Sequence, residues 1–224
     1  MVATREALRP EFLSDLRTIR VVPALKSPST RFLRAKRCLD VVVAIAVLVI
    51  ASPLFLAIFL AVKLTSRGPA LYSCERLGRN GRPFRCLKFR TMVADADEAL
   101  RRMLRSSSAL AEEFERDFKL RRDPRVTRVG RVLRRISLDE LPQFWNVLTG
   151  DMSVVGWRPI VTDEVPRYGD AFSFISSLRP GITGLWQVSG RNDVTYDARV
   201  RLDVEYRTHP TLRTDVSIIF RTIT

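Results

Sequence analysis

The sequence predicts an α/β protein, mostly helical with a few short strands, that is held at a membrane by one kinked helix. Three observations lead to this prediction. An uncharged apolar run of 22 residues lies at 41–62. The pair Asn80-Gly81, a typical hairpin turn, separates two short strand-like runs. Helical stretches then fill much of the chain after residue 94.

The apolar run is long enough to cross a membrane, because 22 helical residues rise about 33 Å and a hydrocarbon core is about 30 Å thick. Ser52 and Pro53 interrupt it near the middle. Proline removes a backbone hydrogen bond and bends a helix, and the serine hydroxyl can bond a carbonyl that the bend frees. Asp40, at the start of the run, is expected to cap the helix.

Basic residues flank both ends of this run. They are Arg31, Arg34, Lys36, Arg37, Lys63 and Arg67. Since basic flanks favour the cytoplasmic side, a straight span would satisfy only one of them. We therefore expect a re-entrant helix that enters and leaves by the same face, with a true span as the alternative.

The rest of the chain divides into three parts. We expect an N-terminal tail over residues 1–35 with a short helix near 11–20, the re-entrant membrane helix over 36–65, and one cytosolic domain over 66–224. Within that domain, helices are expected over 94–120, after the turn at Asp123-Pro124, over 141–150 with Gly150 as C-terminal cap, and over 194–209 and 212–223.

Charge restricts the partners. The chain has 38 Lys and Arg against 24 Asp and Glu, a formal net charge of +14. Such an excess indicates an anionic partner, which could be nucleic acid, acidic lipid or a phosphorylated substrate. The sequence contains no nucleic-acid-binding motif, so we expect no nucleic acid. With one histidine and three widely spaced cysteines, acid-base and nucleophilic chemistry is expected from carboxylates.

The stretch "RRISLDELPQFW" holds an acidic pair, Asp139 and Glu140, next to two arginines. Ser137 and Glu140 match a capping box, which is the structural alternative. Pro142 fits better if the helix begins at Asp139, because a proline is tolerated in the first turn. At such an N-terminus the pair would be held ionised, with lowered pKa, as a nucleophile or metal ligand requires. The residues alone leave both interpretations open.

Several ordered motifs carry a resemblance to a known family. They are "KRCLDVV", "RGPALY", "ERLGRNGRPF", "LKFRTM", "DPRVTRVGRVLRRISLDELPQFWNVLTGDMSVVGWRP" and "PGITGLWQVSGRN". From about Lys36 to its end the chain resembles the bacterial sugar transferases, monotopic phosphoglycosyl transferases that start polysaccharide assembly on a polyprenyl phosphate. The resemblance is to the exopolysaccharide branch in particular. One departure is Trp157, which stands where the family usually has proline.

The resemblance implies a fold and a reaction. A compact catalytic domain with interfacial helices would sit on the cytoplasmic face of the bacterial inner membrane. It would transfer a sugar 1-phosphate, glucose or galactose, from a UDP-sugar to undecaprenyl phosphate and release UMP. Asp139 would be the nucleophile and form a phosphosugar intermediate, Glu140 would assist, and the two carboxylates would bind Mg²⁺.

The resemblance also suggests the substrate contacts. Arg134 is the first candidate for a phosphate contact, and Lys88, Arg90 and Arg158 are further candidates. For each of these cations the alternative is an exposed charge or a contact to inner-membrane lipid. The resemblance is compatible with a homodimer. The alternatives to an enzyme are a non-catalytic, membrane-anchored basic binding protein and a partner in an export complex.

Overall fold

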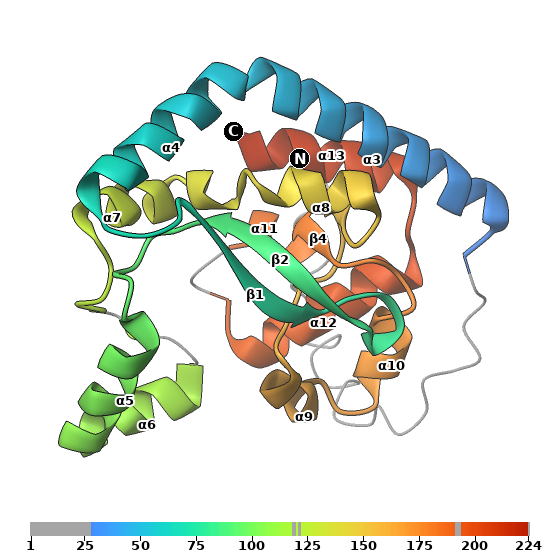
Figure 1. Cartoon of the computed structure of the whole chain (residues 1–224). Coiled ribbons are helices and arrows are strands. Elements are labelled where there is room, and N and C mark those ends of the chain that lie inside the picture. The colour runs from blue at the N-terminus through green and yellow to red at the C-terminus, as the bar shows by residue number, and fades with distance from the viewer. Residues whose placement is uncertain (1–27, 118–119, 121, 191–193, 224) are drawn as a thin grey trace.

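Two helices that meet at an angle, α3 (Thr30–Ile50) and α4 (Ser52–Thr65), lie along one side of the molecule (Figure 1). The structure, a computed structural model, describes residues 28–117, 120, 122–190 and 194–223. The short helix expected near residues 11–20 lies outside this range. α3 begins six residues before the expected start of the membrane helix at residue 36.

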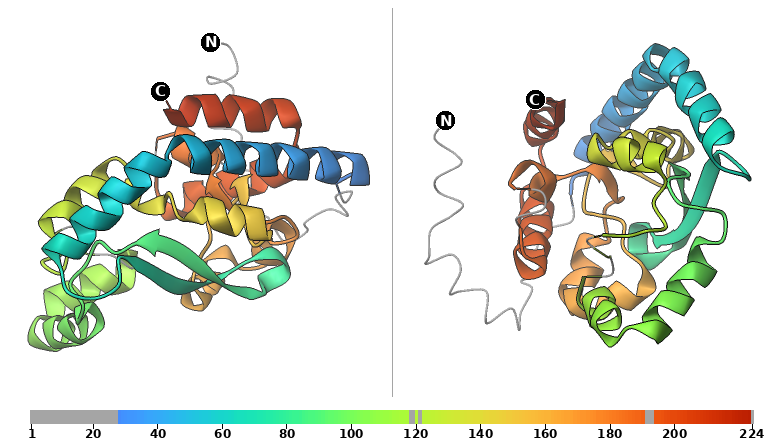
Figure 2. Two further views of the ribbon diagram at one scale, coloured as in Figure 1. Left: turned by 45° about the horizontal axis from the view of Figure 1, so that its top comes forward. Right: turned by 90° about the vertical axis from the view of Figure 1, so that its left-hand side faces the viewer.

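The remaining elements form a helical body with two small sheets (Figures 1 and 2). In chain order they are β1 (Leu71–Leu77), η2 (Arg79–Gly81), β2 (Pro83–Phe89), α5 (Ala96–Ser106), α6 (Ser108–Asp117), α7 (Arg128–Arg135), η3 (Leu138–Glu140), α8 (Gln143–Thr149), β3 (Ser153–Val155), η4 (Thr162–Glu164), α9 (Val165–Tyr168), α10 (Ala171–Ile175), β4 (Gly181–Thr183), α11 (Leu185–Val188), α12 (Tyr196–Thr208) and α13 (Leu212–Ile223). The prediction of a mostly helical α/β fold is confirmed.

The expected hairpin is present. β1 and β2 pair in antiparallel register from Leu71 opposite Phe89 to Leu77 opposite Pro83. Asn80 and Gly81 both have positive φ, 57° and 71°, in the connecting turn. Asparagine and glycine adopt this conformation at low cost, which is why the pair predicts the turn. The hairpin brings the end of β2 towards η3, which carries the acidic pair.

The second sheet consists of two short parallel strands, β3 and β4. Their backbones approach closely beside Gly156 and Gly181, because a Cβ atom on Gly181 would lie 2.1 Å from the backbone nitrogen of Gly156. Only glycine fits this contact. The pairing therefore fixes the loop that follows β3, and this loop carries Arg158.

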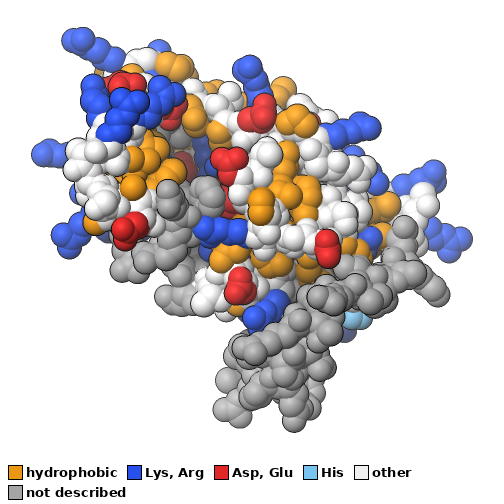
Figure 3. Space-filling model, turned by 90° about the horizontal axis from the view of Figure 1, so that it is seen from below, with side chains coloured by type: hydrophobic (Ala, Val, Ile, Leu, Met, Phe, Trp, Pro, Cys, Tyr) orange, Lys and Arg blue, Asp and Glu red, His pale blue; other side chains and the backbone are white. Residues whose placement is uncertain are grey.

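The face opposite α3 and α4 is shown in Figure 3. Lys and Arg side chains are spread around its rim, and Asp and Glu side chains lie among them nearer the middle. This distribution agrees with the formal net charge of +14. The basic residues expected from the composition therefore lie on the surface of the folded protein, around the rim of this face.

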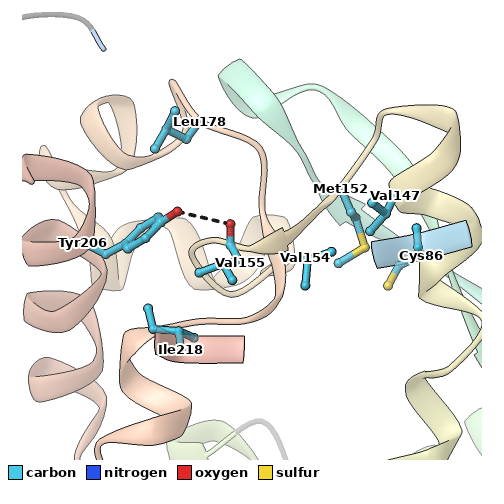
Figure 4. Packing of buried hydrophobic residues seen from close by; sticks show 9 residues of the cluster. Cys86, Val147, Met152, Val154, Val155, Leu178, Tyr206 and Ile218 are labelled. Carbon is cyan, nitrogen blue, oxygen red and sulfur yellow. Dashed lines mark hydrogen bonds between the residues drawn. The ribbon is translucent and has the colours of Figure 1, made fainter. Parts of the chain in front are cut away.

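The main hydrophobic core joins segments from the whole chain. Its buried members come from α3, β2, α8, β3, α12, α13 and the loops that precede β3 and β4, and they are Ala44, Cys86, Val147, Met152, Val154, Val155, Leu178, Tyr206 and Ile218. Figure 4 shows Tyr206 and Ile218 facing Val155, with the Tyr206 hydroxyl oxygen 3.4 Å from the Val155 carbonyl oxygen. Burial of these side chains fastens α12 and α13 to β3.

A buried polar cluster attaches α3 to this core. The Lys36 ammonium donates to the Val155 carbonyl at 2.9 Å and to the Asp215 carboxylate of α13 at 2.8 Å. The Tyr206 hydroxyl donates to the other oxygen of Asp215 at 2.6 Å. Arg37 donates to the carbonyl oxygens at the end of α8, on Val147 and Leu148. Two of the basic residues before the apolar run are thus part of the folded domain.

Asp40 belongs to the same cluster, and its expected role as a helix cap is wrong. It lies inside α3, 2% exposed, and accepts hydrogen bonds at 2.9 Å from the Ser153 hydroxyl and the Val154 amide. The cap of α3 is Ser29, whose hydroxyl oxygen accepts from the Phe32 amide. The carboxylate of Asp40 is used instead to hold β3 against α3, a long-range contact that local sequence does not reveal.

The expected kink at Ser52-Pro53 is confirmed. α3 and α4 are bent by 63° about Ala51, and the Ser52 hydroxyl donates to the Val49 carbonyl at 2.8 Å. Among the described residues, neither helix alone has the length and hydropathy of a membrane span, whereas the bent pair together does. α4 packs on the domain through Ile58 and Val62, which lie against Phe89 and Leu133.

The single helix expected over residues 94–120 is wrong. Two helices, α5 and α6, replace it, because Ser107 between them is extended at φ −149°, ψ 114°. The apolar stripe that suggested one helix is therefore divided between two short ones. The helix after Asp123-Pro124 and the two closing helices are confirmed as α7, α12 and α13.

The polar cluster generates a stability prediction. Lys36→Met should destabilise the fold by about 3–5 kcal/mol, because the buried carboxylate of Asp215 would lose its cation. Thermal unfolding of the detergent-solubilised protein measures this. Arg34→Met, an exposed position on the same helix, is the matched control and should stay within about 0.5 kcal/mol of the parent. Equal effects of the two substitutions would contradict the anchoring role of Lys36.

Candidate active site

The acidic pair lies in a single 3₁₀ turn, η3, rather than at the start of an α-helix. Ser137 adopts the left-handed conformation at φ 58° and its side chain makes no capping bond, so the capping box is not formed. α8 begins at Gln143, with Pro142 as its N-cap residue. The prediction of a helix that begins at Asp139 is therefore wrong. The left-handed residue Ser137 leads into the 3₁₀ turn, and the α-helix begins only after this turn. The N-terminus of an α-helix therefore does not stabilise the charges of Asp139 and Glu140.

Lys88 meets the acidic pair directly. Its ammonium lies 2.6 Å from Glu140 Oε1, joining the end of β2 to η3. Both side chains are partly exposed, 27% for Lys88 and 31% for Glu140. Burial raises the pKa of Glu140, but Lys88 and Arg158 outweigh it and hold the pKa below its usual value. Glu140 is therefore an ionised, salt-bridged carboxylate with a surface open to solvent.

Asp139 has a different environment. It is 7% exposed. Burial raises its pKa above the ordinary value and the neighbouring Glu140 adds to this, while Lys88 and Arg134 act in the opposite direction. The expectation that nearby arginines would lower this pKa is wrong for the protein without substrate, because desolvation dominates. The pKa values of the two adjacent carboxylates are thus shifted in opposite directions and their exposures differ, which is typical of pairs with separate chemical roles.

Arg134 lies near Asp139, since each acts on the pKa of the other. Its Nε donates to the Thr91 hydroxyl at 2.8 Å. Desolvation lowers the pKa of Arg134, and Asp139 is the largest influence that raises it. Thr91 was not singled out from the sequence, although it directly follows "LKFR". Its hydroxyl fixes the guanidinium while leaving the other nitrogens of Arg134 available to a ligand.

Arg90 is placed elsewhere. Its guanidinium donates to the carbonyl and hydroxyl oxygens of Ser66, at 2.8 and 2.9 Å, and packs under Gly68. The side chain is 7% exposed and holds the turn that follows α4. The structure does not bring it to the acidic pair, and its expected substrate contact stays a prediction.

Arg158 lies close enough to Glu140 for its charge to lower the pKa of that carboxyl. The loop that carries it is fixed by its neighbour Trp157, which is 1% exposed and donates from its indole nitrogen to the Leu178 carbonyl at 3.0 Å. The tryptophan that departs from the family pattern is therefore a core residue. It anchors the loop by packing and one hydrogen bond.

Beyond Arg158 lies a group that sequence reasoning missed. Arg158 and Arg199 both lie over the indole of Trp186, with Cζ 5.6 and 4.3 Å from the ring centroid. Asp203, one turn after Arg199 on α12, accepts from the Tyr168 hydroxyl at 3.0 Å. The i, i+4 spacing of Arg199 and Asp203 is the only sequence signal, and it is common on exposed helices.

The pair Asp139 and Glu140 fits Mg²⁺ only with help from a ligand. Among the described residues no group of three or more His, Cys, Asp or Glu side chains is placed to hold a metal ion. Mg²⁺ is commonly held by one or two carboxylates together with substrate phosphates, so two adjacent carboxylates are a suitable protein contribution. The donor set therefore matches a cation that arrives with a phosphorylated substrate.

Comparison with known proteins gives consistent matches. A family model described as "Bacterial sugar transferase" matches residues 31–224. The undecaprenyl-phosphate galactose phosphotransferase of Salmonella typhimurium is 50% identical over 212 residues, which are 94% of this chain and 44% of that protein. Exopolysaccharide production protein ExoY is 49% identical in Sinorhizobium fredii, over 84% of each chain. ExoY of Rhizobium meliloti is 46% identical over 99% of this chain and 94% of its own. The chain thus spans less than half of the Salmonella relative and most of both ExoY proteins.

The buried Asp203 generates a pH prediction. Burial raises its pKa to about 7 despite the bond from Tyr168. With this pKa, the folded state keeps a proton on Asp203 that the unfolded chain releases near pH 4. Asp203 therefore stabilises the fold at low pH, and this contribution is lost as pH rises through about 7. Asp203→Asn keeps the acceptor for Tyr168. The Tm of this variant minus the Tm of the parent should therefore increase by more than about 4 °C from pH 5 to pH 8.

The control for this measurement is Asp170→Asn, an exposed aspartate of the same domain. Its Tm difference from the parent should not change with pH. A constant difference for Asp203→Asn as well would contradict the raised pKa.

Proposed function

Because the chain belongs to the bacterial sugar transferase family and is therefore an enzyme, we propose that it transfers a sugar 1-phosphate from a UDP-sugar to undecaprenyl phosphate and releases UMP. Membership in this family favours catalysis over the non-catalytic alternatives. The name of the Salmonella relative supports galactose as the sugar, and glucose is the second candidate. The ExoY relatives support a role at the start of exopolysaccharide synthesis.

The observation that carries the mechanism is a buried carboxylate between cations. Asp139 lies beside Lys88, Glu140 and Arg134, the groups that act on its pKa. A phosphoryl group entering here would find the positive charges of Lys88 and Arg134 close by, and neutralisation of charge is what transfer of a phosphoryl group mainly requires. We propose that an Asp139 oxygen attacks the phosphate bearing the sugar and that UMP departs. Undecaprenyl phosphate then attacks the phosphosugar intermediate and frees Asp139.

Glu140 and Lys88 act as a unit in this proposal. Their 2.6 Å ion pair holds the ammonium beside Asp139, where it opposes the rise in pKa that burial causes. Mg²⁺ bound by Asp139, Glu140 and the diphosphate would neutralise phosphate charge. Arg134, fixed by Thr91, is proposed to bind the transferred phosphate.

The first test concerns the nucleophile. Asp139→Asn should lower UMP release by at least about 10³-fold and abolish the phosphosugar intermediate, because an amide is not a competent nucleophile here. The assay uses purified protein in detergent with undecaprenyl phosphate, Mg²⁺ and either UDP-galactose or UDP-glucose.

Asp170→Asn serves as the matched control and should retain parental activity. Full activity of Asp139→Asn would remove Asp139 from the mechanism. Absence of UMP release by the parent from both nucleotide sugars would contradict the proposed reaction.

We further propose that the enzyme sits on the cytoplasmic face of the bacterial inner membrane, with α3 and α4 as a re-entrant pair. The bend of 63° supports this. So do large apolar side chains that α3 and α4 leave exposed, namely Val42, Ile45, Val49, Ile50, Leu54, Leu56, Phe59, Leu60 and Leu64. An apolar surface of this extent is unfavourable in water and favourable in a bilayer.

Topology can be tested with single cysteines in a background in which Cys38, Cys74 and Cys86 are replaced by serine. Arg31→Cys and Arg67→Cys place thiols at exposed positions on the two flanks of the helix pair. In intact cells neither should react with a membrane-impermeant maleimide, and both should react after the inner membrane is opened. Labelling of one flank alone in intact cells would indicate a true span.

A further inference from the structure

The group around Trp186 contains buried polar atoms without partners. Among the described residues, four of these atoms lie in this group: Arg158 Nε, Trp186 Nε1, Arg199 Nε and Asp203 Oδ1. A buried donor or acceptor without a hydrogen bond costs free energy, and such groups are rare in native proteins. Three of the four atoms are donors, so the group has an excess of unused donors.

The charges of the group are also unbalanced. Two guanidinium groups share one indole, and Arg199 has its pKa lowered by burial and then by Arg158. Among the described residues, the acid beside them is Asp203, which is 1% exposed and partly protonated near neutral pH because burial raises its pKa. Two cations facing a carboxyl that is only partly ionised leave net positive charge in a desolvated place. An anion would remove this cost.

The position of the group relative to the acidic pair identifies the anion. Arg158 lowers the pKa of Glu140 and Arg134 lowers that of Asp139, so both arginines lie close enough to the pair to act on its charge. The proposed substrate carries two phosphates in series. If Asp139 attacks the phosphate that bears the sugar, beside Arg134, then the other phosphate extends past Glu140 towards Arg158 and Arg199.

We propose that Arg158 and Arg199, held on Trp186, form the binding site for the phosphate that leaves as part of UMP. This assignment rests on the proposed function. An Asp139 oxygen forms a bond to the sugar-bearing phosphorus, and the bond from that phosphorus to the bridging oxygen breaks. The electron pair stays on the bridging oxygen, which becomes a terminal oxygen of UMP. The leaving phosphate thereby gains one negative charge, and the two guanidinium groups neutralise it.

Trp186 is a positioning residue in this site. It is 6% exposed, so its ring is covered by the protein and by the two guanidinium groups rather than open to a base or a sugar. Stacking of a guanidinium on an indole is favourable and restricts its orientation. The indole therefore holds two like charges close together before the substrate arrives, a preorganisation that suits a diphosphate.

The binding test uses UMP as the probe. Calorimetry with the purified full chain in detergent and Mg²⁺ gives its affinity. Arg199→Gln should weaken UMP binding by about tenfold or more, as expected for the loss of one charge-assisted contact. Arg199→Lys should lie between Arg199→Gln and the parent. The matched control is Arg201→Gln, two residues further along α12, which removes the same charge and should bind UMP like the parent.

A kinetic test separates the two half-reactions. Arg199→Gln should slow formation of the phosphosugar intermediate and raise KM for the UDP-sugar. It should leave the reaction of preformed intermediate with undecaprenyl phosphate unchanged, because UMP has departed by then. A merely structural role of Arg199 would slow both half-reactions together. If Arg199→Gln lowers Tm strongly, Trp186→Phe provides the second variant and should weaken UMP binding while preserving the fold.

The outcomes distinguish this inference from the proposed function. If the parent releases UMP but Arg199→Gln and Trp186→Phe bind UMP like the parent, the inference is overturned and the proposed reaction stands. If the parent neither releases nor binds UMP, the proposed reaction fails and the inference fails with it. Parental UMP affinity in Arg201→Gln together with weakened affinity in Arg199→Gln supports the inference, and release of UMP by the parent supports the proposed reaction.

Discussion

The ion pair between Lys36 and Asp215 joins the two ends of the described chain. Lys36 lies on α3, the first described helix, and Asp215 on α13, and the pair is buried against the Val155 carbonyl of β3. A buried pair of this kind contributes little net stability when complete but is costly to break, so it acts mainly to select one arrangement. Arg37 and Asp40 extend it to α8 and β3. The helix proposed to enter the membrane is thereby fixed to the elements that carry the site.

This attachment gives the candidate site its place. α8 follows the acidic pair after only two residues, and β3 leads directly into the loop with Arg158. Because α3 holds both α8 and β3, the distance from the helix pair to the carboxylates is set by rigid packing rather than by a linker. Such an arrangement suits the proposed reaction, in which one substrate comes from water and the other from a membrane. It also explains why Trp157, a core residue, can replace proline beside Arg158: packing fixes the loop.

The two adjacent carboxylates of the candidate site have different surroundings. Glu140 is ionised by its partner Lys88, while Asp139 is kept in a desolvated position between cations. We propose that Arg134 binds one phosphate of the substrate and that Arg158 and Arg199 bind the other. Arg134 is held by Thr91, and Arg158 and Arg199 are held by Trp186. In each case a neighbouring side chain positions the guanidinium, so little rearrangement is needed when phosphate binds.

The sequence by itself determined what depends on neighbouring residues: the hairpin at Asn80-Gly81, the kink at Ser52-Pro53, the C-terminal cap at Gly150, and the motifs that led to Asp139 and Glu140. Only the tertiary structure decided the rest. In the folded protein Asp40 binds β3 instead of capping a helix, and Arg90 donates to Ser66. Burial also raises the pKa of Asp139. The tertiary structure also brought Arg199 and Trp186 together with Arg158. Turns and kinks follow from local backbone sterics, whereas charge state and contact partners follow from which distant segments exclude water around a side chain.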